Sequence, residues 1–144
     1  MDHVAIMRSS WGLTAKIASG QKTIESRWYL NRSAPWDKVH TGDTIYFKDS
    51  GAPVCLKAAV ADVLQFSSLT PAKVRELLER YGALDGLESS DIPTYYERFK
   101  YKRYCLLIFL ADVLAIPPFH IDKRGYGAMA AWITVPSVET LRMR

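Results

Sequence analysis

The run from Ser19 to Trp28 constrains the fold most, because it joins a helix end, a strand start and three charged side chains within ten positions. Gly20 follows apolar residues at helical spacing and predicts the C-terminal end of a helix. Polar and apolar residues then alternate from Thr23 onward, which is the period of a β-strand. On such a strand Glu25 and Arg27 lie on one face, about 7 Å apart.

Lys22 precedes this strand and can lean toward Glu25 and Arg27. One interpretation is a loose ion pair on a solvated strand face, which contributes little, and spacing alone favours it. The functional interpretation is a charged cleft. There Arg27 offers a planar fork and Lys22 a point charge to phosphate, while Glu25 accepts from an exocyclic amine. In an enzyme, Lys22 beside Glu25 could move a proton or activate water.

The spacing Gly-x-Lys-x-x-Glu-x-Arg (Gly20, Lys22, Glu25, Arg27), followed by the run 42–47, resembles the signature of the ASCH domain family. That family belongs to the PUA-like superfamily of small β-barrels. The resemblance implies a barrel with a cleft in which these charges take nucleic acid or a modified nucleoside.

The resemblance is best over residues 4–66, and residues 93–132 would supply the late strands. The predicted helix at 70–82 and the acidic segment after it resemble an insertion between barrel strands.

Some ASCH-family members hydrolyse the amide of an N4-acylated cytidine with the motif lysine, a nearby hydroxyl residue and a glutamate. Lys22 matches that lysine, but Glu25 stands where that branch has threonine, and Thr23 would point to the other strand face. Other relatives are described as ribonucleases. The resemblance therefore leaves open a binding domain or a small hydrolase that uses Lys22 and Glu25.

The length of 144 residues predicts one domain spanning residues 1–144, long enough to bury a core. Apolar residues make up 49% and charged residues 24% of the chain, which is ordinary for a globular protein. Lys and Arg number 19 against 15 Asp and Glu, a net charge of +4 that suits an anionic partner. No cofactor is expected.

The two cysteines, Cys55 and Cys105, lie in apolar runs and are expected to be buried thiols, not a disulfide or metal site. The first residues lack the basic region followed by an apolar stretch that is typical of a secretory signal, so none is expected. The longest apolar run, 105–111, is too short to span a bilayer. We therefore expect a cytoplasmic protein with no membrane partner.

Hydrophobic periodicity predicts an α+β fold with about five or six strands and two or three flanking helices, which suits a closed β-barrel. The resemblance to the ASCH family implies that this barrel is PUA-like. The expected strands are 4–8, 23–30, 43–48, 54–66, 105–114 (ended by Pro117-Pro118) and 128–135, with the third and fourth forming a hairpin. The expected helices are one of about ten residues from Ser9 or Ser10 to Gly20, one at 70–82, and a helical turn after Pro136. Residues 83–93 are expected to form a surface loop, and 31–40 a loop in which Trp36 folds over a neighbour.

Tyrosines and basic residues interleave from Tyr95 to Tyr104. Stacking rings beside cations are typical of sequence-tolerant single-strand binding. The alternative is that the rings pack on the barrel while the lysines are solvated. An intermediate arrangement places Tyr96 or Tyr101 on the cleft rim.

A third candidate segment, 119–127, carries glycines around Tyr126 that could let backbone N–H groups approach an anion. Lys123 and Tyr126 are kept as weaker ligand candidates, whereas His120 is expected to be structural. A lone histidine does not predict a metal site. The sequence thus favours an RNA or single-stranded nucleic-acid binding domain, or one that binds a modified nucleoside, in a basic cleft. Its predicted ligand-binding residues are Lys22, Glu25, Arg27, Tyr96, Tyr101, Lys123 and Tyr126.

Overall fold

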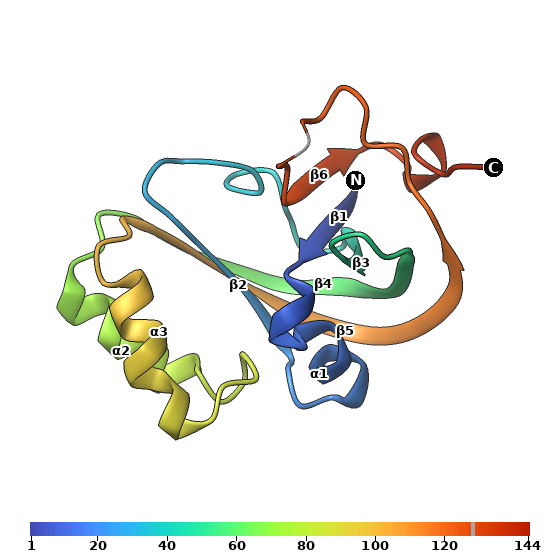
Figure 1. Ribbon diagram of the computed structural model, residues 1–144. Helices are drawn as coiled ribbons and strands as arrows, with labels where there is room; N and C mark the ends of the chain where they lie inside the picture. Colours follow the sequence, from blue (N-terminus) through green and yellow to red (C-terminus); the bar gives the residue numbers. More distant parts are fainter. Residues whose placement is uncertain (128) are drawn as a thin grey trace.

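The computed structural model describes residues 1–127 and 129–144, in which six strands form one curled sheet flanked by three α-helices (Figure 1). The elements are β1 (Asp2–Met7), α1 (Leu13–Ser19), β2 (Ile24–Tyr29), β3 (Thr44–Asp49), β4 (Val54–Phe66), α2 (Pro71–Tyr81), α3 (Ile92–Phe99), β5 (Tyr104–Phe119) and β6 (Trp132–Val135). Short 3-10 helices lie at Ser9–Trp11, Ser89–Asp91 and Val138–Thr140.

The strand order is β2-β5-β4-β3-β1-β6, with β1 parallel to β3 and the other pairs antiparallel. Three register irregularities in the long β4–β5 pair bend these strands, as β-bulges do, and help to curl the sheet into a half-barrel. The predicted α+β fold with six strands and flanking helices is confirmed. The barrel is not closed by hydrogen bonds, because β2 and β6 end the sheet in the described part of the chain.

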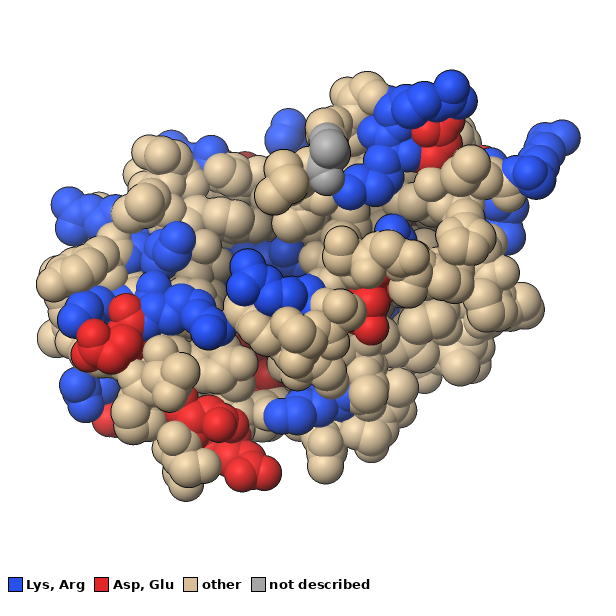
Figure 2. Space-filling model, viewed as in Figure 1, with Lys and Arg blue, Asp and Glu red and all other residues tan. Residues whose placement is uncertain are grey.

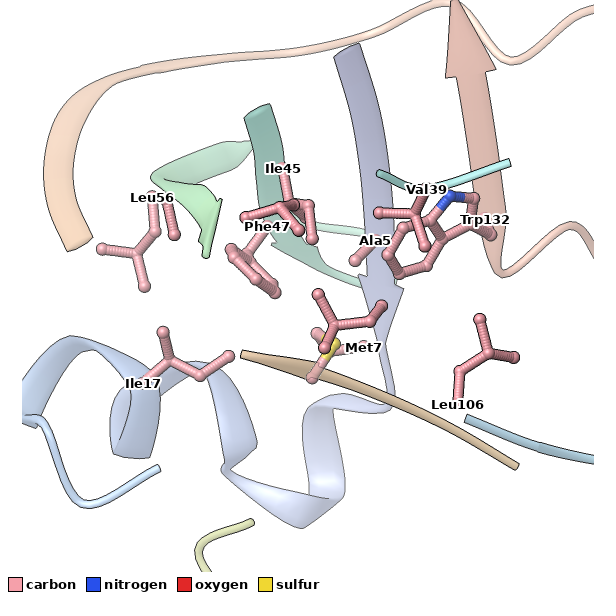
Figure 3. Close-up of a cluster of buried hydrophobic side chains, with 12 residues drawn as sticks. Ala5, Met7, Ile17, Val39, Ile45, Phe47, Leu56, Leu106 and Trp132 are labelled. Carbon is pink, nitrogen blue, oxygen red and sulfur yellow. The ribbon is translucent and has the colours of Figure 1, made fainter. Parts of the chain in front are cut away.

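The concave side of the sheet is filled by apolar side chains that include Phe47, Ile45 and Leu106 (Figure 3). Ile17 from α1 and Trp132 from β6 belong to the same cluster, so helix and edge strand both seal this core. The helices α2 and α3 lie together on another side of the sheet (Figure 1), where a second cluster includes residues from both of them and from β2 and β5.

The N-terminal helix differs from the prediction. Gly12 has φ +64° and separates the 3-10 turn at Ser9–Trp11 from α1, so the expected ten-residue helix is divided in two. The left-handed conformation, which glycine adopts without steric cost, ends the first turn. Gly20, at φ +84°, is the predicted C-terminal cap of α1.

The hairpin of β3 and β4 and the helix α2 are confirmed. Thr70 caps α2 by accepting from the Lys73 amide. The segment 93–99, expected to begin the late strands, instead forms the helix α3 with Pro93 in its first turn. The interleaved aromatic residues there follow helical spacing, which the strand interpretation overlooked.

The strand β5 continues through Pro117 and Pro118, where a break was expected. Its pairing with β4 passes from Ala115 directly to Phe119, so the prolines lie at an irregularity where no ladder N–H is needed. Only its first part is covered on both faces, since Leu114 is 54% exposed.

The last strand, β6, is shorter than the predicted 128–135, and position 128 lies outside the described residues. The expected turn after Pro136 is the 3-10 helix at Val138–Thr140.

Trp36 packs edge-on against Tyr104, as its loop position suggested. Among the described residues, no helix has the length and apolar character needed to cross a membrane.

Both cysteines are free thiols. Cys105 is buried, and burial raises the pKa of its thiol strongly. Cys55 is only partly buried, which corrects the expectation of two buried thiols.

Candidate functional site

The charged motif lies where α1 passes into the edge strand β2. The Lys22 amide donates to the Lys16 carbonyl at 3.0 Å, which holds the turn against the helix end. Along β2, Glu25 and Arg27 share one face, and Arg27 Nη2 lies 3.4 Å from Glu25 Oε2. The predicted ion pair therefore forms, but it lies in a largely buried setting, with only 3% of the Glu25 side chain exposed.

The acidic segment after α2 folds onto the start of β2. The Leu84 carbonyl accepts from the amides of Thr23 (2.8 Å) and Ile24 (3.1 Å), and Lys16 Nζ donates to the Gly86 carbonyl at 2.7 Å. Gly86 has φ +84°, and a Cβ there would lie 3.0 Å from Lys22 Cβ. This segment was expected to be a surface loop, but these contacts bury Asp85 within it.

Lys22 is 1% exposed and is held by two carboxylates. Its ammonium donates to an Asp85 carboxylate oxygen and to the Asp85 carbonyl (3.1 Å), and lies 3.4 Å from Glu25 Oε1. Burial alone would lower the pKa of Lys22, but the charges of Glu25 and Asp85 and their hydrogen bonds outweigh burial and raise it. Lys22 is therefore a cation at neutral pH.

Ser26 and Trp28 complete this arrangement. The Ser26 hydroxyl donates to Asp85 Oδ2 at 2.6 Å and accepts from Trp28 Nε1 at 3.1 Å. Burial and the nearby Glu25 charge raise the pKa of Asp85, against the opposing effect of Lys22. We call Lys22, Glu25, Ser26, Arg27 and Asp85 the motif network; its two cations balance its two carboxylates.

Arg27 reaches across the opening between the two edge strands. Its Nη1 donates to the Ala131 carbonyl at 3.4 Å, and its guanidinium lies 5.1 Å from the ring centroid of Trp132 on β6. One side chain of β2 thus bridges to the opposite edge of the half-barrel. The motif network lies at this seam.

A cavity of about 260 Å³ opens onto the motif network. Its aromatic walls include Trp28 stacked on Phe99, with ring centroids 4.9 Å apart, and Tyr95 edge-on to Trp11. Its lining comprises Ile6, Met7, Arg8, Trp11, Leu13, Lys22, Glu25, Ser26, Arg27, Trp28, Tyr29, Asp85, Leu87, Tyr95, Phe99 and Ala131.

Two further arginines contact the aromatic wall. The guanidinium of Arg8 lies 4.6 Å from the Trp11 ring centroid, and that of Arg98 lies 4.5 Å from it. Figure 2 shows Lys and Arg side chains around the hollow between the helices and the sheet, with acidic side chains gathered below the helices. The cavity thus combines a charge-balanced floor, aromatic walls and cationic residues beside them.

The structure brings together only part of the predicted site. Lys22, Glu25 and Arg27 line the cavity, whereas Tyr96 lies under the Arg75 guanidinium (4.2 Å) outside the lining. Tyr101 is 71% exposed and lies at a separate depression.

On α3 it is Tyr95 and Phe99 that line the cavity, because residues four apart share a helix face. Lys123 and Tyr126 also lie outside the cavity lining, on the segment after β5, where Tyr126 is 44% exposed.

Asp85 is the residue that sequence reasoning missed. Its segment is acidic and rich in turns, and only pairing with a buried lysine distinguishes this carboxylate from its neighbours. Across the described ranges, no cluster of three or more His, Cys, Asp or Glu side chains could hold a metal ion.

Comparison with solved structures assigns the fold. An ASCH structure from Zymomonas mobilis superposes with a TM-score of 0.66 at 20% sequence identity, over 96% of this chain and 90% of that one. The N-terminal domain of McrB from Staphylothermus marinus matches with a TM-score of 0.51 at 14% identity, over 83% of this chain and 76% of that one. The chain therefore has the ASCH fold that the motif predicted.

Sequence comparisons add no closer relative. No protein-family model matches the chain, and no curated protein sequence matches it.

Proposed function

We propose that this domain binds RNA or another single-stranded nucleic acid, or a single modified nucleoside, with one base inserted into the cavity. The observation that carries the proposal is a charge-balanced polar floor beneath aromatic walls. At about 260 Å³ the cavity lies near the lower end of the ~300–1,000 Å³ common for small-molecule sites, which suits one base better than a longer segment.

In this arrangement the residues divide the work of recognition. Trp11 and Tyr95 offer ring faces or edges to a base, and Glu25 accepts from an exocyclic amine with lone pairs that Lys22 and Arg27 leave unused. Because Lys22 is bound by two carboxylates, its role is to hold the floor in place. Arg27 and Arg8 supply the positive charge for phosphate.

A salt-dependent binding assay tests this proposal. Fluorescence anisotropy with short single-stranded RNA and DNA should show affinity that falls with ionic strength, because phosphate contacts release counterions. Arg27→Gln should weaken binding about tenfold or more and reduce the salt slope by about one. Lys57→Gln, a charge-matched change on β4 outside the cavity lining, serves as the control. Absence of affinity for every strand at low ionic strength would refute strand binding.

A small hydrolase is the second candidate, and the Ser26 hydroxyl favours it. That hydroxyl donates to the Asp85 carboxylate at 2.6 Å beside the Lys22 ammonium, an arrangement that places a nucleophile next to a base and a cation. The raised pKa of Lys22 makes it a charge stabiliser in such a reaction, not the base. Incubation with RNA and with acylated cytidine tests this candidate: turnover lost in Ser26→Ala and Glu25→Gln variants that remain folded would support an enzyme.

A further inference from the structure

A second depression, of about 270 Å³, lies beside the end of α3 and the end of β2. Its lining includes Tyr101 and Leu30, which are 71% and 56% exposed, and the cationic residues Lys100, Lys102 and Arg103. Isolated exposed apolar residues are ordinary. Here, however, an exposed ring, an exposed aliphatic side chain and three cations line one hollow.

The second depression borders the same two chain segments as the motif cavity. Tyr29 lines the motif cavity and the next residue, Leu30, lines the second depression. Phe99 and Lys100 are divided in the same way. Because consecutive Cα atoms are about 3.8 Å apart, both hollows border the same ends of β2 and α3.

The cations here are only partly compensated. Lys100 donates to Glu97 at 2.6 Å, and Arg103 gives one donor to the Leu69 carbonyl at 3.3 Å. In the described part of the chain, the Lys102 ammonium has no hydrogen-bond or ion-pair partner, whereas its backbone amide donates to the Phe99 carbonyl at 2.8 Å. A donor set of this kind is complementary to phosphate, and an exposed tyrosine ring offers a stacking face to any base.

We propose that the Tyr101 depression is a second nucleotide subsite, which holds the nucleotide next to the one whose base enters the motif cavity. This inference rests on the proposed nucleic-acid binding function. It adds a path for the bound nucleic acid, which runs along β2 from the motif network toward the turn between α3 and β5. Tyr101 stacks on the second base, and Lys102 and Arg103 contact its phosphate.

Binding measured as a function of ligand length tests the subsite, with labelled mononucleotide, dinucleotide and hexanucleotide RNA as probes and matched DNA as a second series. Tyr101→Ala should weaken hexanucleotide binding at least about fivefold and leave mononucleotide binding unchanged, because the lost contact is one base stack. Tyr101→Phe, which keeps the ring, should bind like the wild type. Lys102→Gln should reduce the salt slope for the hexanucleotide by about one, and Lys57→Gln should not.

The outcomes separate this inference from the proposed function. Hexanucleotide binding that depends on Arg27 but not on Tyr101 would overturn the second subsite alone. Binding that depends on Tyr101 but not on Arg27 would overturn the two-site arrangement, because the Tyr101 depression would then bind a strand without the motif cavity. Equal weakening of mononucleotide and hexanucleotide by Tyr101→Ala, or no binding by the wild type, would overturn the subsite.

Discussion

Among the described residues, two polar centres beside the seam of the half-barrel can be compared, because they handle charge in opposite ways. The motif network at β2 buries Lys22, Glu25 and Asp85 and leaves Arg27 partly exposed. Across the seam, His3 on β1 is fully buried between Asp43 and Trp132, 2.8 Å and 3.1 Å away. The indole N–H of Trp132 can only donate, so His3 Nδ1 accepts and the neutral ring carries its proton on Nε2, toward Asp43.

The two centres differ in whether they keep a charged side chain inside the fold. The histidine centre packs within the fold and avoids a buried cation. The motif network keeps full charges next to an open cavity, although buried ion pairs often add little net stability. This cost fits a role in ligand recognition better than a role in folding. Trp132 connects the centres, because it contacts His3 on one side and Arg27 on the other.

Removing the cation from the motif network should have the largest effect. In Lys22→Met, Glu25 and Asp85 lose their shared partner, and the free energy of unfolding should fall by about 3–5 kcal/mol. The double variant Lys22→Met/Asp85→Leu removes one carboxylate as well and should regain most of that loss. Urea denaturation measures both. Equal stabilities for the single and double variants would show that the charges are not compensating one another.

The close packing of the acidic segment against Lys22 can be tested by substitution of Gly86. Gly86→Ala adds left-handed strain and a Cβ 3.0 Å from Lys22 Cβ, so the stability should fall by about 1–2 kcal/mol or more. Gly51→Ala is the matched control, since Gly51 has φ +79° with nothing within 4 Å of the added Cβ. Both variants carry left-handed backbone strain, so the difference between their stabilities measures the contact of the added Cβ with Lys22. If both variants lost the same stability, Gly86 would have no packing role.

The histidine centre should show itself in the pH dependence of stability. Burial lowers the pKa of His3 below 6.5, against the opposing hydrogen bond and charge of Asp43. The N-terminal ammonium adds a smaller lowering effect, and the Asp2 charge a smaller raising one. The unfolded chain then binds the proton more readily than the folded protein does. The contribution of neutral His3 to the free energy of unfolding is therefore fully present above about pH 6.5 and is lost as the pH falls toward the folded-state pKa.

Thermal unfolding between pH 7.5 and 5 measures this contribution for the wild type and for His3→Gln. The variant should lose part of the decline in stability on acidification. His120→Gln, which changes an exposed imidazole, is the control. An identical pH profile for wild type and His3→Gln would contradict a neutral buried ring.

Much of the fold could be predicted because its elements carry local signals. The alternation of Ile45 and Phe47 and the periodicity of α2 each report burial on one face. The motif charges could be predicted to meet because they are close in sequence. The open seam of the half-barrel could not be predicted, since it depends on which distant strands pair.

The missing parts of the site have a shared physical reason. Asp85 reaches Lys22 from 63 positions away, and the walls contributed by Tyr95 and Phe99 depend on α3 lying over β2. The interleaved tyrosines indicated stacking surfaces, but only the helical period determines which of them face the cavity. Sequence spacing therefore predicted the chemistry of the floor and not the identity of the walls.

Tryptophan fluorescence tests the central claim, insertion of one base into the motif cavity, most directly. Trp11 lines the cavity, whereas Trp36 packs against Tyr104 outside it. We predict that titration with mononucleotides, or with a modified nucleoside such as acylated cytidine, quenches the emission in a saturable way, that Trp11→Phe loses a large part of the change, and that Trp36→Phe retains it. Quenching unaffected by Trp11→Phe, or no saturable quenching with any of these ligands, would contradict base binding in this cavity.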